Sequence, residues 1–108
     1  MKLVQRLILI QFAWLSLLPA QNSPNVPLLA HVNDYPGVGY NDCWGYTAPD
    51  GREYALLGVR NGTSIIDITD TENVYEVTFI PSATSTWKDI KTYQHYAYTV
   101  TEAAGGLQ

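Results

Sequence analysis

The acidic residues and histidines are the first groups in this sequence that could do chemistry. Carboxylates and imidazoles bind zinc and act as general acids and bases. A zinc site needs roughly three or four ligands that converge on one point, and no spacing in the sequence sets such a convergence. We therefore expect these residues to have structural or solvated roles. The candidates for a metal or acid–base site are His31, Asp34, Asp42, Asp89 and His95.

A second set of oxygen donors lies close together in the sequence. Ca²⁺ takes roughly six to eight oxygen ligands on a curved loop. Asp67, Asp70, Glu72 and Asn73 supply such oxygens, but their spacing lacks the EF-hand pattern and its central glycine. The alternative is a polar turn in which Asp67 accepts hydrogen bonds from nearby backbone amides. The sequence favours the turn, so we predict no cofactor and keep Ca²⁺ as the alternative.

The aromatic residues could form a binding surface. Aromatic rings contact apolar and ring-shaped groups, so this set could line a site for a glycan or a peptide. The alternative, which the sequence favours, is packing between neighbouring structural units. The set consists of Tyr40, Trp44, Tyr46, Tyr54, Tyr93, Tyr96 and Tyr98.

Nucleophilic and phosphate chemistry have little support. Ser64, Ser82 and Ser85 stand in no nucleophile-elbow pattern. No glycine-rich phosphate loop follows a strand and opens a helix. The single cysteine, Cys43, lies next to Trp44, and we interpret it as a small buried side chain in a strand. A free reactive thiol or an intermolecular disulfide is the alternative.

Strands must position these side chains, because short β-prone runs separated by turn signals fill the chain after residue 40. No apolar stripe of helical period occurs there. Proline, Asp-Gly and Asn-Gly predict turns at residues 48–51 and 61–62. Strands are predicted over residues 41–47, 53–59, 63–69, 75–80, 86–93 and 96–101.

Two of these runs predict different degrees of burial. Residues 53–59 are almost continuously apolar, which is typical of a strand covered on both faces. Residues 75–80 alternate, which predicts a half-exposed strand with Tyr75, Val77 and Phe79 on one face. The first four runs together predict a four-stranded antiparallel meander.

The pattern restarts after residue 85. Residues 42–46 (DCWGY) match residues 89–93 (DIKTY) at an offset of 47, and residues 54–55 match residues 96–97 at an offset of 42. The offset falls because the first hairpin is five residues longer. A four-stranded unit that recurs every 40–45 residues or so is typical of a β-propeller blade. The residues expected to hold structural positions in the repeats are Asp42, Trp44, Tyr54, Gly62, Asp67, Trp87, Asp89 and Tyr96. Gly106 matches Gly62 at an offset of 44.

The N-terminal residues predict export. Lys2 and Arg6 precede an uncharged apolar run at residues 7–18, and Ala20 ends a short segment suited to cleavage. This pattern is typical of a secretory signal peptide at residues 1–20; an uncleaved anchor is the alternative. An extended leader is predicted at residues 21–39. No second apolar run follows, so no membrane span is expected after cleavage.

Charge and composition argue against other classes of protein. The 108 residues carry six Lys and Arg against ten Asp and Glu, a formal charge of −4. Without residues 1–20, four basic and ten acidic residues remain, and four minus ten is −6. Such a surface repels nucleic acid. One cysteine excludes an internal disulfide, and 46% hydrophobic residues argue for a folded chain.

Three segments together resemble the choice-of-anchor B family, which consists of exported proteins built of LVIVD-type β-propeller repeats. They are residues 41–46 (NDCWGY), 50–55 (DGREYA) and 62–70 (GTSIIDITD), and residues 85–91 (STWKDIK) and 96–98 (YAY) fit the opening of the next repeat. The resemblance covers residues 30–108. It departs where Cys43 replaces an aliphatic residue and where Gly105-Gly106 replace a His-Gly pair. It implies no enzymatic activity.

The sequence therefore predicts an all-β, antiparallel fold made of four-stranded β-propeller blades. The propeller is expected to be incomplete, with about one and a half repeats over residues 40–108, preceded by a signal-peptide helix. We expect an N-terminal piece of a longer protein, because a propeller closes with about four to eight blades. Its localisation would be secreted or at the cell surface.

The predicted function is that of an exported, non-enzymatic binding or scaffold module. Its expected partners are an extracellular protein or glycan and the remaining blades of its own full-length chain, with no nucleic acid. The alternative is part of a propeller-type hydrolase or lactonase with a metal in the central channel. Convergence of His31, Asp42 and Asp89 would favour the enzyme, and a channel lined by tyrosine and alanine would favour binding.

Overall fold

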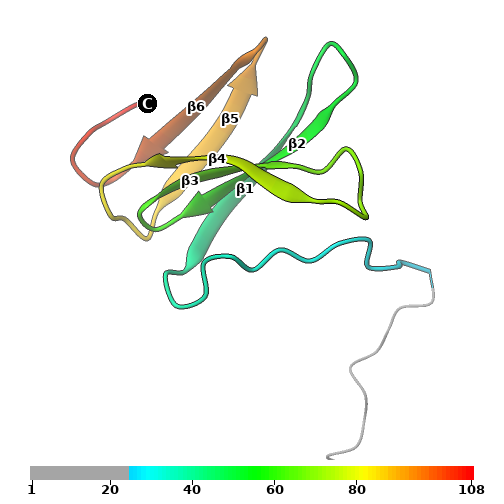
Figure 1. The fold of residues 1–108 in the computed structure, drawn as a ribbon. Helices are drawn as coiled ribbons and strands as arrows, with labels where there is room; N and C mark the ends of the chain where they lie inside the picture. The colour runs from blue at the N-terminus through cyan, green and yellow to red at the C-terminus, as the bar shows by residue number, and fades with distance from the viewer. Residues whose placement is uncertain (1–24) are drawn as a thin grey trace, which may run out of the picture.

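The computed structural model describes residues 25–108, and within them the chain is all-β (Figure 1). The four-stranded sheet and the separate two-stranded sheet that the sequence predicts are both present, and both are antiparallel. No helix among these residues is long and apolar enough to cross a membrane. The predicted signal peptide lies outside the described residues. The strands are β1 (Tyr40–Thr47), β2 (Glu53–Val59), β3 (Gly62–Asp67), β4 (Tyr75–Pro81), β5 (Lys88–Tyr93) and β6 (Tyr96–Thr101).

The four-stranded sheet is a simple meander in the order β1-β2-β3-β4. A five-residue turn joins β1 to β2, and its Gly51 has a φ of +88°. Arg60 and Asn61 alone join β2 to β3, so Val59 faces Gly62 across the hairpin. A Cβ at Gly62 would lie 2.3 Å from the ring of Phe79 and 2.5 Å from the carbonyl oxygen of Ile80. Only glycine fits where β3 passes this close to β4.

A β-bulge changes the predicted pattern of β4. Ile65 pairs with Thr78 and Ile66 pairs with Glu76, so Val77 is an extra residue opposite the break. Simple alternation predicted that Glu76 and Phe79 lie on opposite faces, and this is wrong. The extra residue places both on the same face of the sheet, where the same tyrosine, Tyr35, contacts each of them.

The second sheet repeats the register of the first. Adding the sequence offsets of 47 and 42 converts the pair Tyr46 with Tyr54 into Tyr93 with Tyr96, which is the pair observed. The same offsets convert three further pairs of β1 and β2 into observed pairs of β5 and β6. They are Gly45 with Ala55 into Thr92 with Ala97, Trp44 with Leu56 into Lys91 with Tyr98, and Cys43 with Leu57 into Ile90 with Thr99. The two hairpins are therefore equivalent over these four pairs. Beyond them the register differs, because β1 has a bulge between Tyr40 and Cys43 that β5 lacks.

The last residue continues this equivalence. Gln108 exchanges two backbone hydrogen bonds with Thr99 of β6, at 2.9 and 3.1 Å. The offsets of 44 and 42 relate this pair to Ser64 and Leu57, which face each other between β3 and β2. Gln108 thus lies where the third strand of the second repeat would run, in the same register as in the first repeat.

The two-stranded sheet packs against one face of the four-stranded sheet, with β5 beside β1 (Figure 1). We call the side of the four-stranded sheet that faces β5 and β6 the cleft face; it carries Trp44, Tyr46, Tyr54, Leu56 and Ile65. We call its other side the leader face; it carries Cys43, Gly45, Ala55, Leu57 and Ser64. The second hairpin packs on the cleft face through the side that carries Ile90, Thr92, Ala97 and Thr99, and its opposite, outer face carries Lys91, Tyr93, Tyr98 and Val100.

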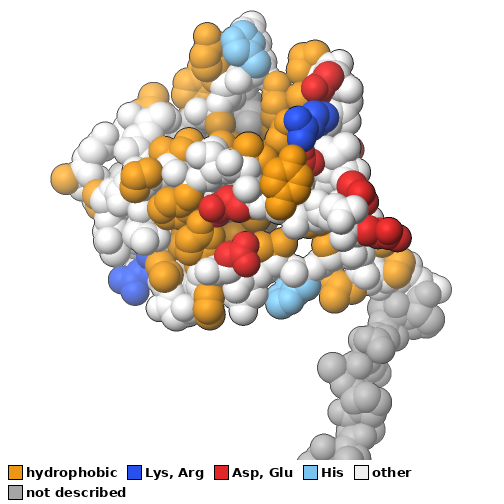
Figure 2. Space-filling view, in the orientation of Figure 1, with side chains coloured by type: hydrophobic (Ala, Val, Ile, Leu, Met, Phe, Trp, Pro, Cys, Tyr) orange, Lys and Arg blue, Asp and Glu red, His pale blue; other side chains and the backbone are white. Residues whose placement is uncertain are grey.

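The apolar core is small and lies near this junction. Leu56, Val59, Ile66 and Ile90 are the buried hydrophobic side chains among the described residues. Within β2 burial is confined mainly to the second half of the strand, although the apolar run predicted cover on both faces. Figure 2 shows hydrophobic side chains over much of the visible surface, including the tips of the two hairpins.

Cys43 is exposed, so the prediction of a buried cysteine is wrong, although its placement in a strand is correct. The reason is visible in the equivalent residue of the second repeat, Ile90, which has no exposed surface. Ile90 faces the sheet that precedes it in the chain. No described segment covers the corresponding face of β1 at Cys43.

Candidate functional site

A concave site lies in a cleft between the two sheets. It has a volume of about 540 Å³, within the range of roughly 300–1,000 Å³ that holds small ligands or one segment of a larger one. Apolar and aromatic side chains of the cleft face form one wall, and the tip of the second hairpin forms the other. The lining residues are Tyr46, Ala48, Tyr54, Leu56, Ile65, Val77, Thr78, Ile80, Thr92, His95, Tyr96 and Ala97.

Cross-strand pairing positions the aromatic wall. Tyr46 and Tyr54 face each other between β1 and β2, and their rings stack with centroids 6.2 Å apart. Opposite them, the tight turn at residues 94–95 places His95 against Tyr96, with ring centroids 4.2 Å apart. Gln94 has a φ of +55°, as this two-residue turn requires. Tyr96 is 56% exposed, so its ring is open to a ligand.

Two contacts of Trp44 join the two sheets beside the cleft, near β1. The indole nitrogen of Trp44 donates a hydrogen bond to Thr92 Oγ1 at 3.0 Å. Lys91 Nζ lies 4.4 Å from the centroid of the Trp44 ring, within the range of a cation–π contact. Trp44 therefore joins the two sheets, which is the packing role that the sequence favoured for the aromatic set.

The chemistry of the cleft lining is that of a binding surface. Among the described residues that line it, none is a carboxylate, lysine or cysteine, and His95 is the one imidazole. A single histidine without a partner acid or nucleophile has no second group with which to share proton transfer. Neutral rings and aliphatic groups instead complement apolar side chains and the flat faces of sugars.

The structure does not bring His31, Asp42 and Asp89 together as metal ligands. Among residues 25–108, no group of three or more His, Cys, Asp or Glu side chains is arranged to hold a metal ion. Asp42 accepts a hydrogen bond from the backbone N–H of Ile90 at 2.6 Å, which links the first strands of the two repeats. His31 and Asp34 are exposed on the leader.

Asp89 has a different environment from its repeat equivalent, Asp42. Its carboxylate pairs with Lys91, and the hydrogen bond from Lys91 lowers the pKa of Asp89 from its ordinary value. The side chain remains 60% exposed. The two carboxylates therefore have different partners: Asp42 binds the backbone of the neighbouring repeat, and Asp89, which is mostly exposed, has Lys91 and Asp42 as its side-chain neighbours.

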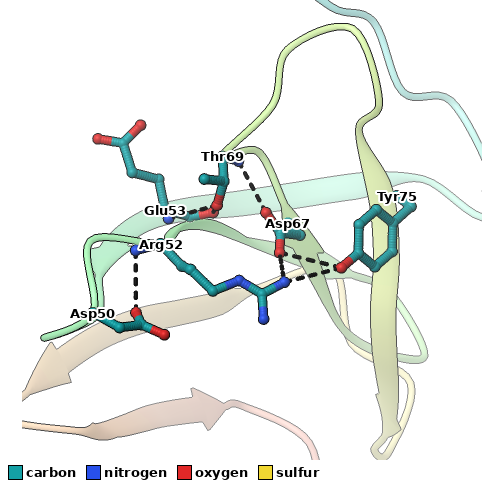
Figure 3. A network of polar contacts seen from close by, with 6 residues as sticks. All are labelled: Asp50, Arg52, Glu53, Asp67, Thr69 and Tyr75. Atoms are coloured by element: carbon teal, nitrogen blue, oxygen red, sulfur yellow. Dashed lines mark hydrogen bonds and ion pairs between the residues drawn. The ribbon is translucent and has the colours of Figure 1, made fainter.

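Asp67 lies in a hydrogen-bonded network at the end of β3 (Figure 3). Its Oδ1 accepts from the Thr69 amide at 2.9 Å, and its Oδ2 accepts from Arg52 and, at 3.3 Å, from the Tyr75 hydroxyl. The hydrogen bonds from Thr69, followed by those from Arg52, lower the pKa of Asp67 to about 2. Both oxygens are used by donors of the chain itself.

The rest of the predicted calcium cluster also forms a turn. Asp70 Oδ1 accepts from the Glu72 amide at 3.0 Å, and its Oδ2 accepts from Asn73 Nδ2 at 2.7 Å. The Asn73 hydrogen bond lowers the pKa of Asp70. Glu72 is exposed. These contacts are those of the polar turn that the sequence favoured over a Ca²⁺ site.

Two further repeat positions lie away from the cleft. Trp87 is 67% exposed just before β5, and its backbone N–H and carbonyl bond to the Ser85 hydroxyl. Gly106 has a φ of +63° and open space around it, so it lacks the steric restriction of Gly62.

Tyr35 makes structural contacts with β4 that sequence reasoning missed. Its ring stacks on Phe79 at 5.2 Å, and its hydroxyl donates to Glu76, which also accepts from Ser64. Burial, followed by the Glu76 hydrogen bond, raises the pKa of Tyr35 to about 12. The signal was present in Pro36-Gly37, because this pair is typical of a turn that can fold an aromatic residue back onto a sheet.

Comparisons with known proteins found no matching family model, no similar curated protein and no similar solved structure.

Proposed function

We propose that this chain is an exported, non-enzymatic binding or scaffold module built from β-propeller repeats, and that the cleft between its two sheets holds the ligand. The observation that carries the proposal is the lining of the cleft, which joins tyrosines and alanines from two repeats without a carboxylate. Such a surface complements an uncharged ligand. The expected ligand is an exposed segment of an extracellular protein or a neutral glycan.

The repeat register supports the propeller part of the proposal. Four equivalent residue pairs in the two hairpins, and a fifth at Gln108, support a single supersecondary unit that is used twice. Units of this kind bury their faces against neighbours, as the second hairpin does on the cleft face. The remaining blades of a longer chain are the corresponding partners of the scaffold.

A metal-dependent hydrolase of the propeller type is the competing function. It would need ligands from several strands that point into one channel. Asp42 binds a backbone amide and Asp89 pairs with Lys91, so neither is gathered with His31 in the described residues. No observation favours this alternative over binding.

The test is a titration of the full chain with two probe panels, neutral oligosaccharides and uncharged peptides rich in tyrosine and leucine, followed by amide chemical shifts. We expect one panel to shift resonances of Tyr46, Tyr54, His95 and Tyr96, and Tyr96→Ala to weaken binding about tenfold, as loss of one stacked ring predicts. Tyr93→Ala is the matched control, because Tyr93 is 67% exposed in the same hairpin and does not line the cleft.

Two results would contradict the proposal. One is the absence of any shift in the cleft residues with both panels. The other is release of cleaved products from the oligosaccharides or from a lactone when Zn²⁺ or Ca²⁺ is added, which would favour the hydrolase.

A further inference from the structure

The turn between β2 and β3 contains the one Asn-Gly pair of the chain. Asn61 is exposed at the tip of this turn, and Gly62 follows it as the first residue of β3. In such a pair the backbone nitrogen of the glycine can attack the carboxamide carbon of the asparagine, because glycine has no side chain to hinder the approach. The attack closes a five-membered succinimide ring.

The reaction needs no partner other than water. The backbone nitrogen of Gly62 gives up its proton and forms a bond to Cγ of Asn61, and the Cγ–Nδ2 bond breaks as ammonia leaves with a proton that it takes from water. Water then opens the ring at either of its two carbonyl carbons. Opening at Cγ yields aspartate. Opening at the former backbone carbonyl yields isoaspartate, in which the main chain runs through Cβ and Cγ.

Backbone contacts from outside the hairpin hold this turn in place. The Asn61 carbonyl accepts from the Ser82 N–H at 2.9 Å, just after the end of β4. The Arg60 carbonyl accepts from the Ser85 N–H at 2.9 Å, and the Arg60 N–H donates to the Gly39 carbonyl at 3.1 Å. The leader and the linker between β4 and β5 are therefore both attached to this turn.

The N–H that the reaction must remove is also bonded. The Ile68 N–H donates to the Glu53 carbonyl at 2.9 Å, which marks a hydrogen-bonded position between β2 and β3. Such positions recur at every second residue of an antiparallel ladder, and the unbroken register carries this alternation to Val59 and Gly62. The Gly62 N–H therefore donates to the Val59 carbonyl.

Ring closure requires the peptide unit between Asn61 and Gly62 to rotate, so that its nitrogen reaches Cγ of Asn61. This rotation breaks both hydrogen bonds of the unit, the one to Val59 and the one from Ser82. The reaction is therefore slow in the folded hairpin and proceeds when the turn opens locally.

We propose that Asn61 is a modification site, at which asparagine is converted to aspartate and isoaspartate through a succinimide, and that the folded hairpin restrains this conversion through Val59 and Ser82. The isoaspartyl product loosens the turn, because it adds one carbon to the main chain between two fixed hydrogen bonds. Gly62 has no room to absorb the change, since even a Cβ there would lie 2.3 Å from the Phe79 ring. The attachment of the linker at Ser82 is lost with the turn.

The first test compares conversion in the folded chain and in urea. The full chain is incubated at mildly alkaline pH, and the peptide that contains Asn61 is released by cleavage after glutamate for mass spectrometry. We expect conversion in both samples, about thirtyfold slower in the folded chain, the factor for two backbone hydrogen bonds that must open first. Asn73, which is exposed but precedes the bulky Val74, should stay unchanged in both. The turn does not line the cleft, so the inference does not depend on the proposed function.

A pair of variants isolates the hydrogen bond from the linker. Ser82→Pro removes the N–H that the Asn61 carbonyl accepts, and Ser82→Ala keeps it. Ser82→Pro should raise the conversion rate of the folded chain about fivefold, the factor for one hydrogen bond, and Ser82→Ala should leave it unchanged. Circular dichroism checks that both variants fold. A urea series below the unfolding transition gives the same comparison without a substitution, because conversion at Asn61 and amide exchange at Gly62 should rise together.

The consequence for the turn is tested on the isoaspartyl chain, purified from an aged sample. Asn61→Asp is the matched control, because it has the same charge and differs only in the path of the main chain. Amide exchange at Ser82 should be about fivefold faster in the isoaspartyl chain than in Asn61→Asp, as expected for the loss of one hydrogen bond.

An Asn61 side chain that stays unconverted in urea would overturn the modification site. Conversion that is as fast in the folded chain as in urea, that is equal in folded Ser82→Pro and Ser82→Ala, or that does not follow amide exchange at Gly62 would overturn the restraint. Equal amide exchange at Ser82 in the isoaspartyl chain and in Asn61→Asp would overturn the loosening of the turn.

Discussion

The two repeats share one register and differ in which of their faces is covered. In the first repeat the cleft face is covered at Leu56, which is 3% exposed, and open at Trp44, which is 41% exposed, while the leader face is open at Cys43. In the second repeat the relation is reversed, since Ile90 is fully buried and Tyr98, the equivalent of Leu56, is 39% exposed. The burial of a position thus depends on which neighbouring unit covers it, and the strand alone does not determine it.

Truncation of the covered position should have the largest effect. Ile90→Ala removes a fully buried side chain at the junction of the two sheets, and should lower the free energy of unfolding by about 3 kcal/mol. Cys43→Ala, the matched change at the equivalent exposed position, should alter it by less than about 0.5 kcal/mol. Urea unfolding of both variants measures the difference. Equal losses would show that the two positions are not in different environments.

Substitution of the turn glycines should separate the repeats next. Gly62→Ala forces a Cβ against Phe79 and the Ile80 carbonyl, and should cost about 2 kcal/mol through overpacking. Gly106→Ala meets open space and opposes only its φ of +63°, so its cost should be about 1 kcal/mol. Thermal unfolding gives both values. Gly45→Ala, with open space and ordinary extended backbone, should change stability least.

The hydrogen bond between the repeats predicts an intermediate effect. Asp42→Ala removes the acceptor of the Ile90 N–H and should lower stability by about 1.5 kcal/mol, the value of one hydrogen bond to a charged group. Asp89→Ala removes an exposed carboxylate and should leave the stability of the dilute chain nearly unchanged. A larger loss for Asp89→Ala would reverse the assignment of the two carboxylates.

The smallest expected effect is a pH dependence that arises where the leader packs on the first repeat. The pKa of Tyr35 is raised to about 12 from 10.0, so the unfolded chain loses the phenol proton at a lower pH than the folded chain. The stability that Tyr35 contributes is complete below pH 10 and is lost as pH rises towards 12. Unfolding measured from pH 9 to 12 should show this decline, and Tyr35→Phe should reduce it. An unchanged decline in Tyr35→Phe would assign it to other groups.

The sequence predicted most of the strand arrangement because the turn signals are local. Each of the six predicted strands is observed, with boundaries that differ by at most two residues. The repeat offsets also predict the register of the second hairpin, since Tyr46, Tyr54, Tyr93 and Tyr96 fix both turn lengths. The sequence also favoured the polar turn at Asp67 and Asp70, whose donors are close in the chain.

Long-range contacts account for what sequence reasoning missed. The bulge opposite Ile65 and Ile66 depends on how β3 meets β4, and no residue of β4 signals it. The exposure of Cys43 depends on which unit covers β1. The cleft requires residues from both repeats, such as Tyr54 and His95, whose distance is set by packing between sheets. The signal-peptide prediction lies outside the described residues.

The turn lengths have a consequence for engineering. Beyond the equivalent pairs Tyr46 with Tyr54 and Tyr93 with Tyr96, the first hairpin is five residues longer. It adds one strand pair, Thr47 with Glu53, and a five-residue turn in place of a two-residue turn, yet the pairs before the turn remain equivalent. Length changes at this turn are therefore absorbed without a shift in strand pairing. Residues 94–95 and 48–52 stand at the mouth of the cleft, so peptides inserted there would change what the cleft contacts and leave the two sheets intact. The hairpin tips are the positions at which new recognition loops can be grafted onto this scaffold.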